Sequence, residues 1–225
     1  MLVGKMIRQY LINKTNRETL LYKFIDKTIF NILRIKAVIF SKKFPKNIKK
    51  LHLGCGHTFL TGFLNSDILG DYPIDITKNL PFKNNSIEFI YNSNLIEHIY
   101  LYQFQKFLKE SYRVLKPKGE MIIITPCLDL IFKNKHNLTK QIERYNNKHS
   151  ILKSNTFSEY LNFLIHLGYG HKYLYDTDLI IFLSKQAGFK AEVIDYKDIK
   201  NPEIVKSIEQ DKTTLKITGV VKITK

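Results

Sequence analysis

From Lys50 onward the sequence alternates short apolar segments with stretches of helical spacing, and this alternation limits the possible folds more than any other feature. The predicted strands are residues 51–54, 63–68, 72–76, 87–93, 121–125, 191–196 and 215–224. The predicted helices are residues 101–115, which stop at the Lys116-Pro117-Lys118-Gly119 turn, and residues 176–187. Strands that alternate with helices predict an α/β fold with a doubly wound, mostly parallel sheet.

The chain divides into an N-terminal extension and one domain. Residues 1–48 are predicted to be a basic, amphipathic helical extension, with its helix over residues 18–40. Residues 49–225 form the predicted domain, and residues 127–172 interrupt its pattern as an insertion. The apolar face of the extension has two interpretations. It lies on an anionic membrane, or it packs on the domain and covers the ligand cleft.

The basic charge is concentrated in the extension. Residues 1–50 hold 13 Lys and Arg against Glu18 and Asp26 only, which is +11 of the total net charge of +16. This distribution weakens a nucleic-acid interpretation of the whole chain.

Cys55 and Cys127 form neither a disulfide framework nor a metal-ligand spacing, so we expect a reducing cytoplasm and no metal. Neither a secretory signal nor a transmembrane helix is expected.

A glycine turn and two acids follow consecutive predicted strands. The turn Leu53-Gly54-Cys55-Gly56 ends the first strand, Asp67 ends the second and Asp75 ends the third. Ligands of doubly wound sheets bind beyond these carboxyl ends, but Phe59 replaces the third glycine of the dinucleotide pattern. A carboxylate at Asp67 can accept hydrogen bonds from both hydroxyls of a ribose. Asp75 can accept from the exocyclic amine of an adenine, with the backbone of Ile76 at the ring edge. The alternative for each acid is a turn or capping residue.

Four segments resemble a known family. The sequences LHLGCG (51–56), LPFKNNSIEFIYNSNLIEHI (80–99) and FLKESYRVLKPKGEMIIITP (107–126) resemble class I S-adenosylmethionine (SAM) dependent methyltransferases of the type 11 kind. The segment HKYLYDTDLIIFLSKQAGF (171–189) is similar to the tail of a bacterial subgroup that is often linked to cell-surface glycan synthesis. The resemblance covers about residues 50–195.

The resemblance implies a Rossmann-like sheet of seven strands, with the last strand antiparallel, and SAM as the cofactor. The cofactor-binding residues that it implies are Gly54, Cys55 and Gly56 near the methionine and ribose, Asp67 at the ribose, Asp75 and Ile76 at the adenine, and Asn92 beside the methionine end. Two positions depart from the family pattern. Thr58 replaces the usual third glycine of the turn, and Asn94 replaces the subgroup's first histidine after the fourth strand.

Two histidines are candidate catalytic bases for a hydroxyl acceptor. His98 follows the fourth predicted strand at the mouth of the cleft, and His171 lies close to a predicted lid. The alternative for His98 is that Glu97 and His98 begin a helix and brace the loop. The alternative for His171 is a surface histidine that is hydrogen-bonded to the backbone.

The predicted function is SAM-dependent O-methylation of a sugar, or of a glycan or lipid-linked intermediate. The acceptor is thus a small molecule or a glycan, and the protein is cytoplasmic with peripheral membrane contact through residues 18–40. Two alternatives stay open: an RNA-directed methyltransferase, and a non-catalytic SAM-fold protein that binds membranes or partners. Methylation of nucleic-acid bases is disfavoured. The Pro-Cys nucleophile of cytosine-C5 methyltransferases follows the fourth strand, whereas Pro126-Cys127 follows the fifth predicted strand. The Pro-Pro-aromatic signature of amino-group methylation on bases is missing from residues 92–95, which read Asn-Ser-Asn-Leu.

Overall fold

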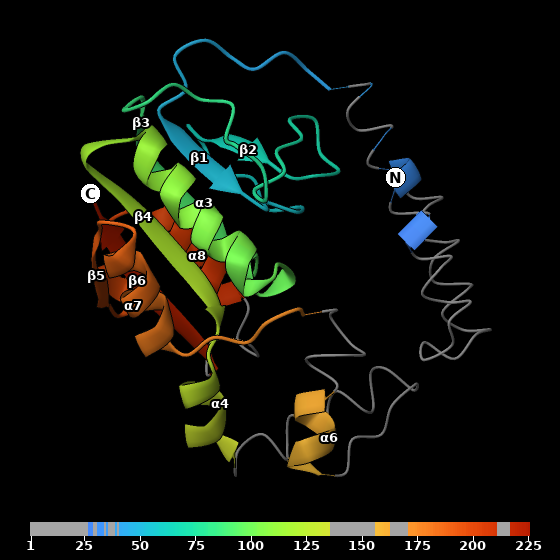
Figure 1. Cartoon of the computed structure of the whole chain (residues 1–225), viewed down its shortest axis with the longest axis vertical. Helices are drawn as coiled ribbons and strands as arrows, with labels where there is room; N and C mark the ends of the chain where they lie inside the picture. Colours follow the sequence, from blue (N-terminus) through green and yellow to red (C-terminus); the bar gives the residue numbers. More distant parts are fainter. Residues whose placement is uncertain are drawn as a thin grey trace.

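A sheet with the strand order β2-β1-β3-β4-β6-β5 forms the centre of the computed structural model (Figure 1). The structure describes residues 27, 28, 31–33, 35, 39, 41–135, 156–162, 171–210 and 217–225. The strands are β1 Lys50–Leu53, β2 Leu64–Ser66, β3 Ile87–Ser93, β4 Leu115–Pro126, β5 Lys190–Val193 and β6 Thr218–Thr224. The helices are η1 Ile96–His98, α3 Leu101–Val114, α4 Leu128–Lys133, α6 Phe157–Asn162, α7 Thr177–Gln186, η3 Tyr196–Asp198 and α8 Pro202–Gln210.

The strand directions agree with the predicted mostly parallel sheet. Strands β2, β1, β3 and β4 pair in parallel, whereas β6 runs antiparallel to both of its neighbours, β4 and β5. The prediction that the last strand is antiparallel is therefore confirmed. The carboxyl ends of β1, β2, β3 and β4 lie along one edge of the sheet, where the candidate site forms.

Each face of the sheet is covered by different helices, because side chains alternate between the faces along a strand. Figure 1 shows α3 and α7 in front of the sheet and α8 behind it. The first face combines Leu51, Leu53, Ile90, Met121, Ile123, Val221 and Ile223 with Phe104, Phe107, Leu108, Ile180 and Leu183 of α3 and α7. The second combines Tyr91, Ile122, Ile124 and Val220 with Ile204 and Ile208 of α8. Burying each large apolar side chain contributes about 1.5–3 kcal/mol.

The third predicted strand, residues 72–76, does not form, so the described residues make six strands rather than the predicted seven. Its backbone finds partners outside a ladder. The Tyr72 carbonyl accepts a hydrogen bond from Ser66 Oγ at 2.6 Å. Pro73 has no N–H to donate to a neighbouring strand, and Asp75 closes a local turn with Thr77. The sheet therefore ends at β2.

The predicted turn at residues 116–119 becomes a large irregularity inside β4. Ile87 pairs with Leu115 and Phe89 pairs with Glu120, so the four residues of the turn lie opposite Glu88 alone. The C-terminal residue holds this bulge: the Lys118 N–H donates to the Lys225 carbonyl at 2.9 Å, and the Lys225 N–H donates to Gly119 at 3.0 Å. The predicted end of the helix is confirmed at Val114, but β4 begins earlier than expected.

Part of the predicted extension and insertion lies outside the described residues. The described residues from 27 to 39 are helical, and the side chains of Ile32, Ile35 and Ile39 are 50%, 59% and 68% exposed. In the insertion, α4 and α6 are two short helices, while residues 136–155 and 163–170 are not described. Within the described chain, no helix combines the length and the apolar character that crossing a membrane requires.

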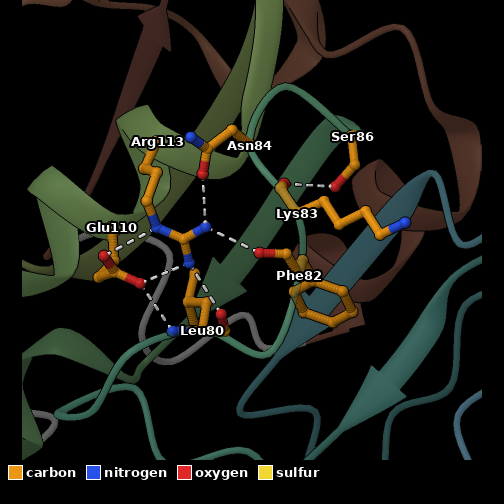
Figure 2. A network of polar contacts seen from close by, with 7 residues as sticks. All are labelled: Leu80, Phe82, Lys83, Asn84, Ser86, Glu110 and Arg113. Atoms are coloured by element: carbon orange, nitrogen blue, oxygen red, sulfur yellow. Dashed lines mark hydrogen bonds and ion pairs between the residues drawn. The ribbon is translucent and has the colours of Figure 1, made fainter.

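An arginine on α3 holds the segment that leads into β3 (Figure 2). The Arg113 guanidinium donates hydrogen bonds to the carbonyl oxygens of Leu80 and Phe82 at 2.8 Å and to Asn84 Oδ1 at 2.9 Å. It also forms a two-point contact with the Glu110 carboxylate, which accepts the Leu80 N–H at 2.8 Å. The planar guanidinium donates in several directions at once, which an ammonium on a flexible stem does not reproduce.

We predict that Arg113→Lys lowers the free energy of unfolding by about 2–3 kcal/mol, because most of these charge-assisted bonds are lost while Glu110 keeps its burial. Urea denaturation followed by circular dichroism measures the change. Lys109→Ala, on the exposed side of the same helix, is the matched control and should stay within about 0.5 kcal/mol of the wild type. Equal effects of the two substitutions would contradict the role of Arg113.

Candidate functional site

The turn after β1 has a backbone that favours glycine. Gly54 has a φ of +70° and Gly56 a φ of +52°, both in the left-handed region that side chains rarely adopt. A Cβ atom on Gly54 would lie 2.7 Å from Leu95 Cδ1, so the loop after β3 packs directly on this backbone. The Cys55 N–H continues the pairing toward β2 by donating to the Ser66 carbonyl at 3.0 Å.

Asp67 lies beside this turn, as predicted. Its Oδ2 accepts the Gly56 N–H at 3.1 Å, and its Oδ1 accepts the Leu69 N–H at 3.1 Å. A carboxylate offers about four acceptor positions. Two backbone donors therefore orient the group and still leave it able to accept hydrogen bonds from a diol. The structure thus brings Gly54, Cys55, Gly56 and Asp67 together.

Asp75 and Ile76 take part in local structure instead. Asp75 Oδ1 accepts both the N–H and the hydroxyl of Thr77, at 3.0 Å and 2.6 Å. This geometry agrees with the turn-residue alternative for Asp75. The Ile76 side chain is buried in the main core. A role at an adenine therefore stays a prediction for both residues.

A cavity of about 200 Å³ opens beside the glycine turn. Its lining comes from the ends of β1, β3 and β4 and from α8 and β6. The lining residues are His52, Gly54, Cys55, Thr58, Tyr91, Ser93, Asn94, Ile124, Ser207, Ile208 and Thr218. Of the predicted cofactor residues, Gly54 and Cys55 belong to this lining, and Gly56, Asp67, Asp75, Ile76 and Asn92 do not. Both positions that depart from the family pattern, Thr58 and Asn94, line the cavity.

The ionisable groups in this cavity are held neutral. Burial lowers the pKa of His52 to about 4, although its Nδ1 lies 3.2 Å from Asn65 Oδ1. Burial likewise raises the pKa of the Cys55 thiol to about 11, so it is not a thiolate at neutral pH. Asn94 has a φ of +50°, and asparagine tolerates this backbone better than most side chains.

Asn92, near the end of β3, has a buried side chain whose polar atoms lack protein partners. Its side chain is 0% exposed, and within the described chain neither Nδ2 nor Oδ1 has a hydrogen-bond partner. Buried amides are nearly always hydrogen-bonded, so an unpartnered one is a marker of a ligand or an ordered water. A position beside the methionine end of SAM stays a prediction for Asn92.

The two candidate bases come together, and Glu97 joins them. The ring centroids of His98 and His171 are 5.0 Å apart at 81°. Glu97 is 0% exposed, and its Oε2 accepts the Thr125 hydroxyl at 3.0 Å. The Glu97 carbonyl accepts the Lys172 N–H at 2.7 Å, which ties the segment after His171 to η1. These contacts agree with the bracing alternative, since η1 carries His98 and holds the segment after His171. A catalytic role for His98 stays a prediction.

Burial sets the protonation of this cluster. It raises the pKa of Glu97 to about 7, and hydrogen bonds from its own backbone and from Thr125 only partly offset this. Burial also lowers the pKa of His171 to about 4, with a smaller effect from His98. At neutral pH His171 is therefore an uncharged imidazole. Sequence analysis missed Glu97 as a site residue; its signal is an acid inside the apolar run Leu95-Ile96-Glu97-His98-Ile99.

Comparisons with known proteins support the fold, and one family model matches part of the chain. The family described as "Methyltransferase domain" matches residues 70–123. A SAM-dependent methyltransferase structure from Archaeoglobus fulgidus superposes with a TM-score of 0.51 at 14% identity, covering 96% of this chain and 99% of that chain. A second one, from Mesorhizobium loti, gives a TM-score of 0.47 at 13% identity and covers 85% and 96% of the two chains.

A curated relative is an uncharacterised protein of Methanocaldococcus jannaschii, 29% identical over 131 residues, or 51% of this chain. The chain spans about half the length of that relative, 56%. The superposition supports the α/β fold, and the family match lies within the segment that carries the resemblance in the sequence.

Gly54→Ala should separate backbone strain from the contact with Leu95. We predict a loss of about 2 kcal/mol or more in the free energy of unfolding, because the new Cβ meets Leu95 in addition to the unfavourable φ. Gly62→Ala is the matched control: its φ is +76°, and nothing lies within 4 Å of a Cβ there. It should cost about 1 kcal/mol. Denaturation with urea measures both, and equal losses would show that Leu95 gives way.

Proposed function

We propose that this chain is a SAM-dependent methyltransferase whose cofactor lies along the carboxyl ends of β1, β2 and β3. The observation that carries the proposal is the contact between the Gly56 N–H and the Asp67 carboxylate, beside the left-handed Gly54. This contact joins a backbone bend, open to close approach by a ligand, to an oriented acceptor of ribose hydroxyls.

Each predicted cofactor residue receives a role in this proposal. Gly54, Cys55 and Gly56 approach the methionine and ribose through their backbone, and Asp67 accepts from the ribose hydroxyls. The buried Asn92 amide supplies a donor and an acceptor at the methionine end, which would give its unpartnered atoms partners. Asp75 and the backbone of Ile76 are assigned to the adenine.

Methyl transfer chiefly requires positioning. When bound, SAM supplies an electrophilic methyl group on a positively charged sulfonium. The protein has to hold the acceptor oxygen in line with it, at about 3–3.5 Å from the methyl carbon. His98 is exposed after η1 and is the proposed base for the acceptor hydroxyl, while the neutral His171 orients it. The proposed acceptor is a sugar, or a glycan or lipid-linked intermediate, because residues 171–189 resemble the glycan-linked subgroup.

Peripheral membrane contact is proposed for the N-terminal extension. Ile32, Ile35 and Ile39 recur at helical spacing with exposed side chains. Basic residues follow them, among which Lys43 and Lys46 are also exposed. An apolar stripe beside positive charge suits an anionic lipid surface, and each nearby cation contributes about 1 kcal/mol.

The first test is SAM binding by isothermal titration calorimetry. We predict that the wild type binds SAM and that Asp67→Ala weakens the affinity about 10- to 100-fold, because hydrogen bonds to a charged acceptor are lost. Asp71→Ala is the matched control. It removes an exposed acid of the same loop, paired with Lys42 at 2.6 Å, and should leave the affinity unchanged. Absence of SAM binding to the wild type would end the proposal; unchanged affinity in Asp67→Ala would remove only the ribose assignment.

Vesicle sedimentation tests the membrane contact. The full chain should bind vesicles of anionic phosphatidylglycerol and not those of neutral phosphatidylcholine. The triple variant Ile32→Ser, Ile35→Ser and Ile39→Ser should lose about tenfold or more in partitioning. Phe182→Ser, which changes an apolar side chain 55% exposed on α7, controls for general stickiness. Equal loss in both variants, or binding to neutral vesicles, would contradict the proposal.

A further inference from the structure

Three side chains that commonly bind metals meet just beyond the end of β3. One ligand atom each from Glu97, His98 and His171 lies within 4.8 Å of the others. The proposed cofactor site uses none of the three to hold SAM. Two imidazoles and one carboxylate form a frequent three-residue ligand set for zinc-type ions, with a further position left for water or substrate.

The carboxylate of Glu97 lacks a hydrogen-bond partner on one oxygen and a counter-charge among the described residues. Its side chain is 0% exposed, and Oε2 accepts from Thr125, but Oε1 has no hydrogen-bond partner within the described residues. Among those residues, no Lys or Arg forms an ion pair with it either. A buried carboxylate without a counter-charge is costly, and a bound cation removes that cost.

The surrounding structure holds the ligands in place before any ion arrives. Besides the bond from Lys172, the Glu97 carbonyl accepts the Tyr173 N–H at 3.3 Å. The same segment is then fixed at Tyr175, whose carbonyl accepts the Leu128 N–H at 2.7 Å. The segment that follows His171 is thus tied to η1 and to the start of α4. His98 is exposed, which leaves one side open.

We propose that Glu97, His98 and His171 bind one divalent transition-metal ion of the zinc type. Metal–ligand bonds of about 2.0–2.2 Å in a tetrahedron place ligand atoms about 3.4 Å apart. The ligand atoms lie within 4.8 Å of one another, so binding requires them to approach by about 1.4 Å at most, and the exposed His98 ring has room to rotate. The sequence predicted no metal because its two cysteines lack a metal-ligand spacing. That prediction does not bear on this site, because no cysteine takes part in it. The inference does not depend on SAM binding. Because an imidazole that binds a metal ion does not also accept a proton, the metal site is an alternative to the base role proposed for His98.

Metal titration of the purified full chain tests the proposal. After removal of metals with a chelator, Co²⁺ is added and its visible absorption recorded, and Zn²⁺ is then used to displace it. We expect one ion per chain with a Zn²⁺ dissociation constant below about 1 µM. Glu97→Gln keeps the shape of the side chain and should weaken binding at least about 10-fold. His57→Ala removes an exposed histidine after the glycine turn and should bind as the wild type does.

Stability provides a second readout if a variant is poorly folded. Zn²⁺ should raise the melting temperature of the wild type and of His57→Ala, but not that of Glu97→Gln. Less than about 0.2 ions per chain, equal affinity in Glu97→Gln, or a preference for Mg²⁺ over Zn²⁺ would overturn the proposal. SAM calorimetry on the metal-free chain keeps the two proposals separate. SAM binding without metal binding contradicts only the metal site, and metal binding without SAM binding contradicts only the cofactor assignment.

Discussion

The packing of Leu95 on the backbone of Gly54 is the contact on which both candidate sites depend. A side chain at position 54 would occupy the place of Leu95, at 2.7 Å from its Cδ1. The glycine thus lets the loop after β3 descend onto the turn after β1. One side of this contact is the turn that binds Asp67, and the other side continues into η1, which carries Glu97 and His98. The two sites therefore share one support.

Polar groups without protein partners mark the same edge of the sheet. Asn92 is buried with an unpartnered amide, and Glu97 is buried with an unpartnered Oε1 among the described residues. A protein interior seldom tolerates such groups unless a ligand completes them. The opposite situation holds at Arg113, whose guanidinium donates to the segment that enters β3 and to Glu110 on its own helix. The saturated contacts of Arg113 secure the segment that enters β3, whereas Asn92 and Glu97 keep unpartnered atoms where the two proposals place ligands.

Local periodicity correctly predicted the helices, because their spacing and capping depend on residues close together in the chain. The amphipathic spacing of residues 101–115 became α3, and Asp176 became the N-cap of α7, accepting the Leu179 N–H at 2.7 Å. The apolar run at 72–76 was wrong as a strand, because Ser66 and Thr77 offered side-chain partners that a sequence pattern does not show. The early start of β4 was missed for a similar reason, since the bulge at 116–119 is held by the chain terminus at Lys225.

The sequence by itself determined the doubly wound α/β sheet, the glycine turn and the acid beside it, because hydrophobic period, glycine and strand-end position are local properties. It also marked His98 and His171 as separate candidates. Only the tertiary structure decided that these histidines meet around a buried Glu97. Burial and the partners of a buried group are set by segments far apart in the chain. In this protein β3, β4 and the segment after His171 converge at one edge of the sheet.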